Sequence, residues 1–485
     1  MLKRTSLFLL CGVMSCAAPK DPNSADYWID HLDREESREE AIHKLGDLKD
    51  KKAIPPLVKL LKESPADRPA IAQTLGMIGD TSAVQPLLAA IDPDPGSGGD
   101  EATHTKHRAN ERIAQALGAL HAKESEDAML KLLSSRDQYE KLAAVHALGD
   151  VGTKKSVTPL CDLVRQDENM FMKKTATESL GTIGDADAVP CLVEAMFIEK
   201  GASIYPQASF ALVQVGPAAV PALLAAMQRK NPAIEKMKEE KGFLEGAVEA
   251  KCAEVLGDLR AKSAEDALVA LFTSTKNPII QRNVAIALSR FGGPKSVGAI
   301  SKVANEPAAD LREFYVDALN ELGDRGALPA LASAAKTGDA SAKLVAFIAY
   351  SRLGDTRELA AATALAGKDA DMQKELVRFA AAKECGDNSE CWIGKLKAPD
   401  AKVRERAAYG LGRAGDKKAA TALLAAAKDD NNDARYAAIW ALYRVGNKAQ
   451  VPELHKIIDS ENGKMQFVRI NEDTKRLIVF LNRQG

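Results

Sequence analysis

The sequence has few aromatic residues and no excess charge of either sign. Phe, Trp and Tyr make up 5% of the 485 residues, and 66 Lys and Arg residues stand against 67 Asp and Glu residues. A balanced charge gives no overall field that would attract a polyanion, so the composition does not support nucleic-acid binding. Few aromatic and many alanine side chains favour closely packed short helices over a β-sheet.

Sequence patterns of known catalytic sites are also missing. There is no Gly-x-Ser-x-Gly motif and no phosphate-binding loop. Of the seven histidines, only His104 and His107 are spaced like metal ligands, and their acidic surroundings favour a solvated loop over a zinc or calcium site. The sequence therefore predicts a noncatalytic protein with no metal, no cofactor and no small-molecule substrate.

One motif recurs along almost the whole chain. Variants of Leu-Gly-x-(Ile/Leu/Val)-Gly-Asp appear thirteen times, most of them 29 to 32 residues apart, with clear copies at 75–80, 180–185 and 411–416. Each copy closes a helix with small residues, and a second apolar segment follows. A repeat of this length buries its apolar face only by stacking on its neighbours. We therefore expect an all-α fold, a right-handed α-α superhelix of about thirteen helix pairs over residues 27–463.

Two longer spacings and the end of the chain depart from the repeat. The insertion near 92–110 contains a run rich in Gly, Pro and acids, which predicts a loop, whereas the charged insertion near 229–245 predicts a lengthened helix or a protruding connection. Repeat proteins often place binding loops at such insertions. A helical run within 464–485, which carries Leu477 and Leu481, is expected to cap the last repeat.

The first residues have the pattern of an export signal. Lys3 and Arg4 precede a short apolar core, and the run that ends at Cys16 resembles a bacterial lipobox. This resemblance implies a signal peptide over 1–15, a lipid on Cys16, a tether over 16–26 and a place in the bacterial envelope. We expect the outer membrane, facing the periplasm; the alternative is a secretory peptide cleaved near Ala17 or Ala18.

The cysteines outside the signal fall into two groups. Cys161, Cys191 and Cys252 lie at or beside apolar repeat positions, where buried thiols are expected. Cys385 and Cys391 bracket one interhelix turn, at places where other repeats have an apolar pair. If those pairs touch across the turn, the two sulfurs can bridge. We predict a disulfide between them, with two reduced core thiols as the alternative.

The repeat at 403–412 resembles a known family. Its sequence, Val-Arg-Glu-Arg-Ala-Ala-Tyr-Gly-Leu-Gly, is similar to the consensus of HEAT repeats, in particular the short phycobilisome-lyase-type form. The resemblance covers about 27–460 and implies an α-solenoid whose basic residues, such as Arg404 and Arg435, form a ladder along the stack. The family also includes deoxyhypusine hydroxylase, whose His-Glu metal ligands have no counterpart in this chain.

In HEAT solenoids the first helix of each pair lines the concave side, so its outward positions are candidates for recognition. In the first three repeats these positions are mostly polar, but in the last six they are largely apolar or aromatic. The predicted partner-binding residues are Ile286, Phe314, Val345, Ile348, Val377, Tyr409, Tyr436, Trp440 and Tyr443, with Arg406, Arg413 and Arg444 at the rim. The alternative is that tight curvature or a shifted helix register buries them.

These patterns together favour one class of function. We expect a noncatalytic scaffold of the bacterial cell envelope that binds a protein or peptide partner on the concave face of the solenoid. The alternatives are an enzyme or enzyme accessory, such as a lyase-like cofactor-attachment factor, and a purely structural envelope component.

Overall fold

The computed structural model describes residues 21–199, 202–305, 311–461 and 468–484. Within these ranges all regular structure is helical, apart from one isolated bridge between Glu199 and Ser203. The predicted all-α class is thus confirmed. The predicted signal peptide, Cys16 and the first part of the tether lie outside the described residues. The described residues form two compact units, which divide between Pro159 and Leu160.

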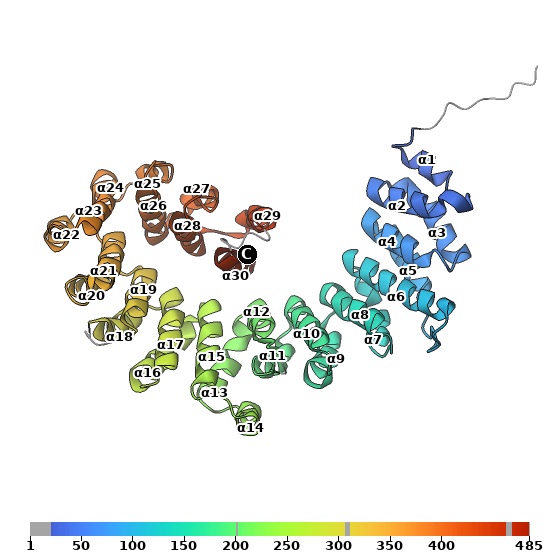
Figure 1. Ribbon diagram of the computed structural model, residues 1–485, viewed down its shortest axis with the longest axis horizontal. Helices are drawn as coiled ribbons and strands as arrows, with labels where there is room; N and C mark the ends of the chain where they lie inside the picture. The colour runs from blue at the N-terminus through green and yellow to red at the C-terminus, as the bar shows by residue number, and fades with distance from the viewer. Residues whose placement is uncertain (1–20, 200–201, 306–310, 462–467, 485) are drawn as a thin grey trace, which may run out of the picture. The chain divides into compact units, whose positions relative to one another are not determined.

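The first unit is a stack of helix pairs. Its first helices α2, α4, α6 and α8 contact one another in succession, and each second helix packs against the following first helix (Figure 1). The helices are α1 (Ala25–Ile29), α2 (Arg38–Leu48), α3 (Ile54–Glu63), α4 (Arg68–Ile78), α5 (Val84–Ala89), α6 (Glu101–Ala119), α7 (Glu126–Leu132) and α8 (Gln138–Val151), and α9 (Lys154–Gln166) crosses the unit boundary.

The second unit continues the same arrangement, with α10, α12, α15, α17, α19 and α21 in successive contact. Its helices are α10 (Met170–Ile183), α11 (Val189–Ala195), α12 (Tyr205–Val215), α13 (Val220–Met227), α14 (Pro232–Lys241), α15 (Ala247–Asp258), α16 (Glu265–Ser274), α17 (Pro278–Phe291), α18 (Pro294–Ala304), α19 (Arg312–Leu322), α20 (Leu328–Ala334), α21 (Ala340–Leu353), α22 (Leu359–Ala366), α23 (Ala370–Glu375), α24 (Val377–Cys385), α25 (Ser389–Lys395), α26 (Ala401–Ala414), α27 (Ala420–Ala426), α28 (Asn432–Val445), α29 (Val451–Glu461) and α30 (Val468–Asn482).

Each glycine and the aspartate of the repeated motif have a distinct structural role. A Cβ atom on Gly181 would lie 2.7 Å from the backbone of Ala211, so this glycine lets α10 and α12 approach closely. Gly184 ends α10 with a φ of 70°, a left-handed conformation that glycine adopts without strain. The side chain of Asp185 then caps the short turn that leads into α11. The motif therefore specifies both the close helix contact and the sharp turn after it.

Both insertions and the C-terminal segment contain helices. The first insertion is a loop up to Asp100, whose side chain caps α6, so the residues after it are helical. The second insertion forms the separate short helix α14. Helix α30 packs on α28 and α29, and it also contacts α12, far away in the sequence. Its Leu477 and Leu481 are fully buried.

The basic residues of the predicted ladder act mainly through backbone carbonyl groups. Lys173 donates to the carbonyl oxygens of Val164 and Arg165 at 2.7 and 3.0 Å. Arg404 is also paired with the Asp429 carboxylate, at 2.7 Å. Lys173 thereby satisfies carbonyl groups at the end of α9, where no intrahelical donor is available.

Among the described residues, no single helix has both the length and the apolar composition to cross a membrane. Two consecutive segments, Tyr205–Val215 and Pro217–Met227, meet both criteria only when they are taken together, and they are bent by 112° relative to each other.

Candidate interaction sites

The concave surface that was predicted to bind a partner lies in the second unit and is largely closed. Tyr409 and Trp440 are only 3% and 5% exposed, and Arg406 is buried as well. Phe314 remains exposed, and the other eight predicted residues are partly buried: Ile286, Val345, Ile348, Val377, Tyr436, Tyr443, Arg413 and Arg444. The prediction of an open surface is therefore wrong for Tyr409, Trp440 and Arg406, and for the others a binding role stays a prediction.

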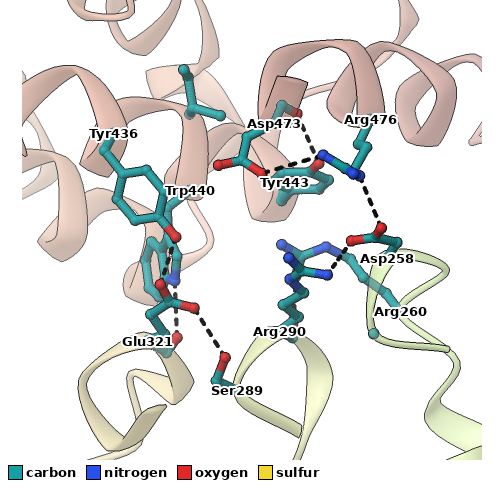
Figure 2. A pocket seen from close by; sticks show the side chains of 12 residues that line it. Asp258, Arg260, Ser289, Arg290, Glu321, Tyr436, Trp440, Tyr443, Asp473 and Arg476 are labelled. Carbon is teal, nitrogen blue, oxygen red and sulfur yellow. Dashed lines mark hydrogen bonds and ion pairs between the residues drawn. The ribbon is translucent and has the colours of Figure 1, made fainter. Parts of the chain in front are cut away.

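The reason is that the second unit curls until its own repeats meet. The Tyr436 hydroxyl donates to the Glu321 carboxylate at 2.6 Å, and the Trp440 indole N–H donates to the Glu321 carbonyl oxygen at 2.9 Å. These residues are more than a hundred positions apart in the sequence and belong to α28 and α19. We call this closure, together with the charged residues described next, the clasp (Figure 2).

Charged residues extend the clasp to α30. The Asp258 carboxylate at the end of α15 accepts hydrogen bonds from Arg290 and, at 2.9 Å, from Arg476 of α30. Arg260 stacks on the Tyr443 ring at 3.8 Å. The cavity left between them measures about 30 Å³, room for about two water molecules. The predicted concave groove is thus filled by the chain itself at this place.

Three arginines, of which Arg406 is buried, close a second region of the same unit. Arg325, Arg406 and Arg413 donate to the carbonyl oxygens of residues 353, 354 and 352 at 3.2, 3.0 and 2.9 Å. These are the last carbonyls of α21 and the residue after it, the negative end of the helix dipole. Burial lowers the pKa of Arg413 to about 10. Arg406 and Arg413 were expected at an exposed rim; instead they bridge α26 to α21.

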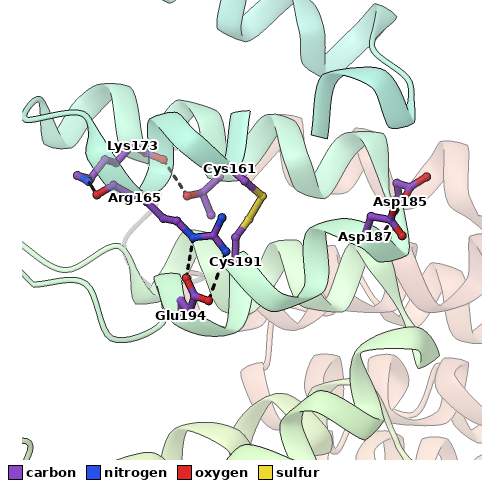
Figure 3. Close-up of a disulfide and its surroundings, with 8 residues drawn as sticks. Cys161, Arg165, Lys173, Asp185, Asp187, Cys191 and Glu194 are labelled. Atoms are coloured by element: carbon purple, nitrogen blue, oxygen red, sulfur yellow. Dashed lines mark hydrogen bonds and ion pairs between the residues drawn. A yellow bond between two sulfur atoms is a disulfide. The ribbon is translucent and has the colours of Figure 1, made fainter. Parts of the chain in front are cut away.

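Two disulfides are present in the second unit. Cys161 of α9 and Cys191 of α11 are joined, with their Cα atoms 5.9 Å apart (Figure 3). The expectation of buried thiols is wrong for this pair, although Cys252 is buried and free. Cys385 and Cys391 also form a disulfide across their turn, with a Cα separation of 5.3 Å.

A row of apolar side chains, of which the sequence analysis predicted only Phe314, lies at one edge of the second unit. It occupies the start of the first helix, or the residues just before it, in five successive repeats, α10, α12, α15, α17 and α19. Those helices contact one another in order, so their N-terminal ends share one edge. We call these residues the edge row: Phe171, Tyr205, Leu244, Ile279 and Phe314.

The edge row is open to solvent at four of its five positions. Phe171 is 61% exposed, Leu244 80%, Ile279 51% and Phe314 37%. Cations accompany it: Arg282 lies over the Phe314 ring at 4.4 Å and Lys251 over the Tyr205 ring at 5.1 Å. The signal in the sequence was an apolar residue six to thirteen positions before the repeat glycine position, a stretch that the motif itself does not include.

In the first unit, a cavity of about 460 Å³ lies beneath the inserted loop. We call it the loop pocket; its lining includes Pro93–Ser97 of the loop, His107 of α6, Lys131 of α7, the turn at 134–136 and Glu140 of α8. Asn110 ties the loop to α8, because its amide donates to the Asp92 carbonyl oxygen at 2.7 Å and to the Glu140 carboxylate at 2.8 Å.

His107 is charged in this arrangement. Its Nδ1 contacts the Glu140 carboxylate and its Nε2 lies 3.2 Å from the Gly96 carbonyl oxygen. An ionised carboxylate and a carbonyl oxygen are both acceptors, so this geometry favours the doubly protonated ring. Burial opposes the charge, but the hydrogen bond and charge of Glu140 outweigh it and raise the His107 pKa above its usual value of about 6.5.

We expect the first unit to lose stability as the pH rises above ~6.5, the unfolded-state pKa of histidine. A folded-state pKa above the unfolded value gives stabilisation that is complete below pH ~6.5 and is lost as the pH passes the folded pKa. Urea unfolding over a pH series should show this loss, and Glu140→Gln should remove it. His43→Gln, at an exposed position of α2, is the control. An unchanged pH profile in Glu140→Gln would contradict the charged pair.

The described residues contain no group of three or more His, Cys, Asp or Glu side chains that could hold a metal ion. His104 and His107, the pair with metal-like spacing, are therefore not joined there by further ligands. His107 instead holds the inserted loop, as described above.

Comparison with known proteins identifies the repeat. The model of HEAT repeats matches residues 25–98, 100–170, 126–197, 245–313 and 392–468, together more than half of the chain. No curated protein matches the sequence.

The chain is similar to several solved structures, at low identity and with TM-scores below 0.5. A complex of Kap95 with Nup1 is 11% identical, with a TM-score of 0.48, over 93% of this chain and 73% of that chain. A crystal structure of importin beta is 11% identical, with a TM-score of 0.49, over 93% and 71%. Human deoxyhypusine hydroxylase is 18% identical, with a TM-score of 0.22, over 55% and 94%. From the match to the repeat model, the chain belongs to the HEAT-repeat family.

Proposed function

We propose that this chain is a noncatalytic scaffold of the bacterial cell envelope and that it holds a protein partner along the edge row. The observation that carries the proposal is the recurrence of large apolar side chains, most of them exposed, at or just before the N-terminal ends of successive first helices. Apolar surface of this kind is typical of protein interfaces, and aromatic residues are favoured anchors. With Arg282 beside it, the row suits a partner segment that carries both apolar and acidic side chains.

Photocrosslinking in intact cells tests this function. A photoreactive residue at 171 or 279 should capture one dominant protein, and the same residue at 273, an exposed position of second helix α16, should not. Phe171→Asp should weaken capture from 279 by about tenfold or more, because charge replaces an anchor residue. Equal capture from 171, 279 and 273 would contradict a specific edge site.

Purification and the crosslinking experiment together separate the alternatives. The similarity to phycobilisome-lyase-type repeats suggests a cofactor-attachment accessory, which would carry a chromophore or metal after purification. A purely structural envelope component would give no dominant crosslinked partner.

The envelope location rests on the signal sequence and on the cysteines. The two disulfides support an oxidising compartment outside the cytoplasm, because such bonds are rare in reducing ones. A lipid on Cys16 would hold the chain on a membrane, which we propose is the outer membrane with the repeats in the periplasm.

Cys16→Ser should therefore abolish labelling by a fatty-acid analogue and move the chain out of the membrane fraction. Cys11→Ser, inside the predicted signal peptide, should leave both unchanged. Labelling that persists in Cys16→Ser would show that the lipid, if any, lies elsewhere.

A further inference from the structure

We propose that the loop pocket of the first unit is a binding site for a small oxyanion, the phosphate or carboxylate group of a soluble ligand. Its volume of about 460 Å³ falls within the usual range for small-molecule sites, roughly 300–1,000 Å³. The proposal is independent of the edge row, which lies in the other unit.

The cations of the pocket are available to a ligand. Lys131 and Arg136 both line the cavity, both are exposed, and neither forms an ion pair with any residue that the structure describes. A guanidinium group matches the planar spacing of oxygens in phosphates and carboxylates, and it can bind two of them at once.

The buried acid of the pocket, in contrast, is fully occupied. The Glu140 carboxylate accepts hydrogen bonds from Asn110 at 2.8 Å, from Ser135 at 2.9 Å and from charged His107. Its charge is thus offset by that of His107. The remaining charged lining groups are Lys131, Arg136 and Asp94, which leave the pocket with a net positive charge and make a metal cation an unsuitable ligand.

The inserted loop adds backbone donors. None of the N–H groups of residues 96–99, a Gly-Ser-Gly-Gly run, donates a hydrogen bond to another described residue. Gly96 has a φ of 94°, and Gly96 and Ser97 line the cavity. Successive free N–H groups in a glycine-rich turn form the concave donor sets that bind anions in many proteins, because no side chain keeps the anion from the backbone.

Isothermal titration of the full-length protein tests the site, with inorganic phosphate and succinate as separate probes. Binding of either supports the proposal, and the preferred probe identifies the ligand group. Arg136→Ala and Lys131→Ala should each weaken binding about tenfold or more, the effect of losing one charged hydrogen bond. Lys44→Ala, at an exposed lysine of α2, should bind as the unmodified protein does.

Thermal unfolding midpoints should be the same in all three variants, because the replaced side chains are exposed. A variant with a lowered midpoint is replaced by Arg136→Gln or Lys131→Gln, which keep more of the side chain. Absence of binding by both probes, or equal affinity in the variants and the unmodified protein, would overturn the proposal.

Discussion

Trp440→Ala should lower the free energy of unfolding of the second unit by about 3–5 kcal/mol, the usual cost of truncating a buried Trp. The indole is 5% exposed, packs edge-on against the Tyr409 ring at 4.9 Å and lies beneath the Arg444 guanidinium at 3.4 Å. Alanine would leave a cavity and would deprive the Glu321 carbonyl of its donor. Urea unfolding followed by circular dichroism measures the effect.

The surroundings of Trp440 are shaped to receive it. A Cβ atom on Gly412 or Gly323 would lie 2.7 or 2.9 Å from the indole ring, so both glycines leave room for it. Phe314→Ala is the matched control, because Phe314 is an aromatic residue of the same predicted stripe that remains exposed. It should cost less than about 1 kcal/mol. If Trp440→Ala left stability unchanged but abolished partner binding, the open groove predicted from sequence would be right and the clasp wrong.

Removal of the Cys161–Cys191 disulfide is the change with the next largest expected effect. The double replacement Cys161→Ala and Cys191→Ala should lower the free energy of unfolding by about 3–4 kcal/mol, because the bond closes a long loop in the unfolded chain. Its cysteines are 30 residues apart, whereas Cys385 and Cys391 are 6 apart. The corresponding replacement of the second pair should therefore cost less, about 2 kcal/mol.

Cys252→Ala provides the comparison, because this buried cysteine forms no disulfide. Reductant should bring the unmodified protein to the stability of a variant that lacks both pairs, and should leave that variant unaffected. If thiol labelling of the unfolded, unreduced protein modified Cys161 or Cys191, the bond would not form in solution.

The fold could be predicted because its determinants are local. Gly181, Gly184 and Asp185 act within one helix end and one turn, and the same sequence pattern recurs in other repeats. The disulfide turn at 385–391 is equally local. The Cys161–Cys191 pair was missed although its spacing of 30 residues is one repeat length, which places both cysteines on neighbouring second helices.

The candidate site could be predicted only in part, because exposure depends on contacts between distant repeats. Helical periodicity assigned Tyr409 and Trp440 to an outward face, whereas both are buried in the hydrophobic core of the C-terminal repeats. It could not indicate that Glu321 and Asp258, from repeats far earlier in the chain, would meet that face. Apolar residues at the outward positions of successive helices have the same sequence pattern whether a partner or the chain itself covers them.

The sequence by itself therefore determined the helix pair, its turn and its stacking, since each rests on contacts within about one repeat length. Only the tertiary structure decided which faces remain open. Curvature accumulates from small rotations between successive repeats, and no single motif encodes their sum. In the second unit that sum brings α28 and α30 onto α15, α17 and α19, buries the predicted stripe, and leaves the edge row exposed.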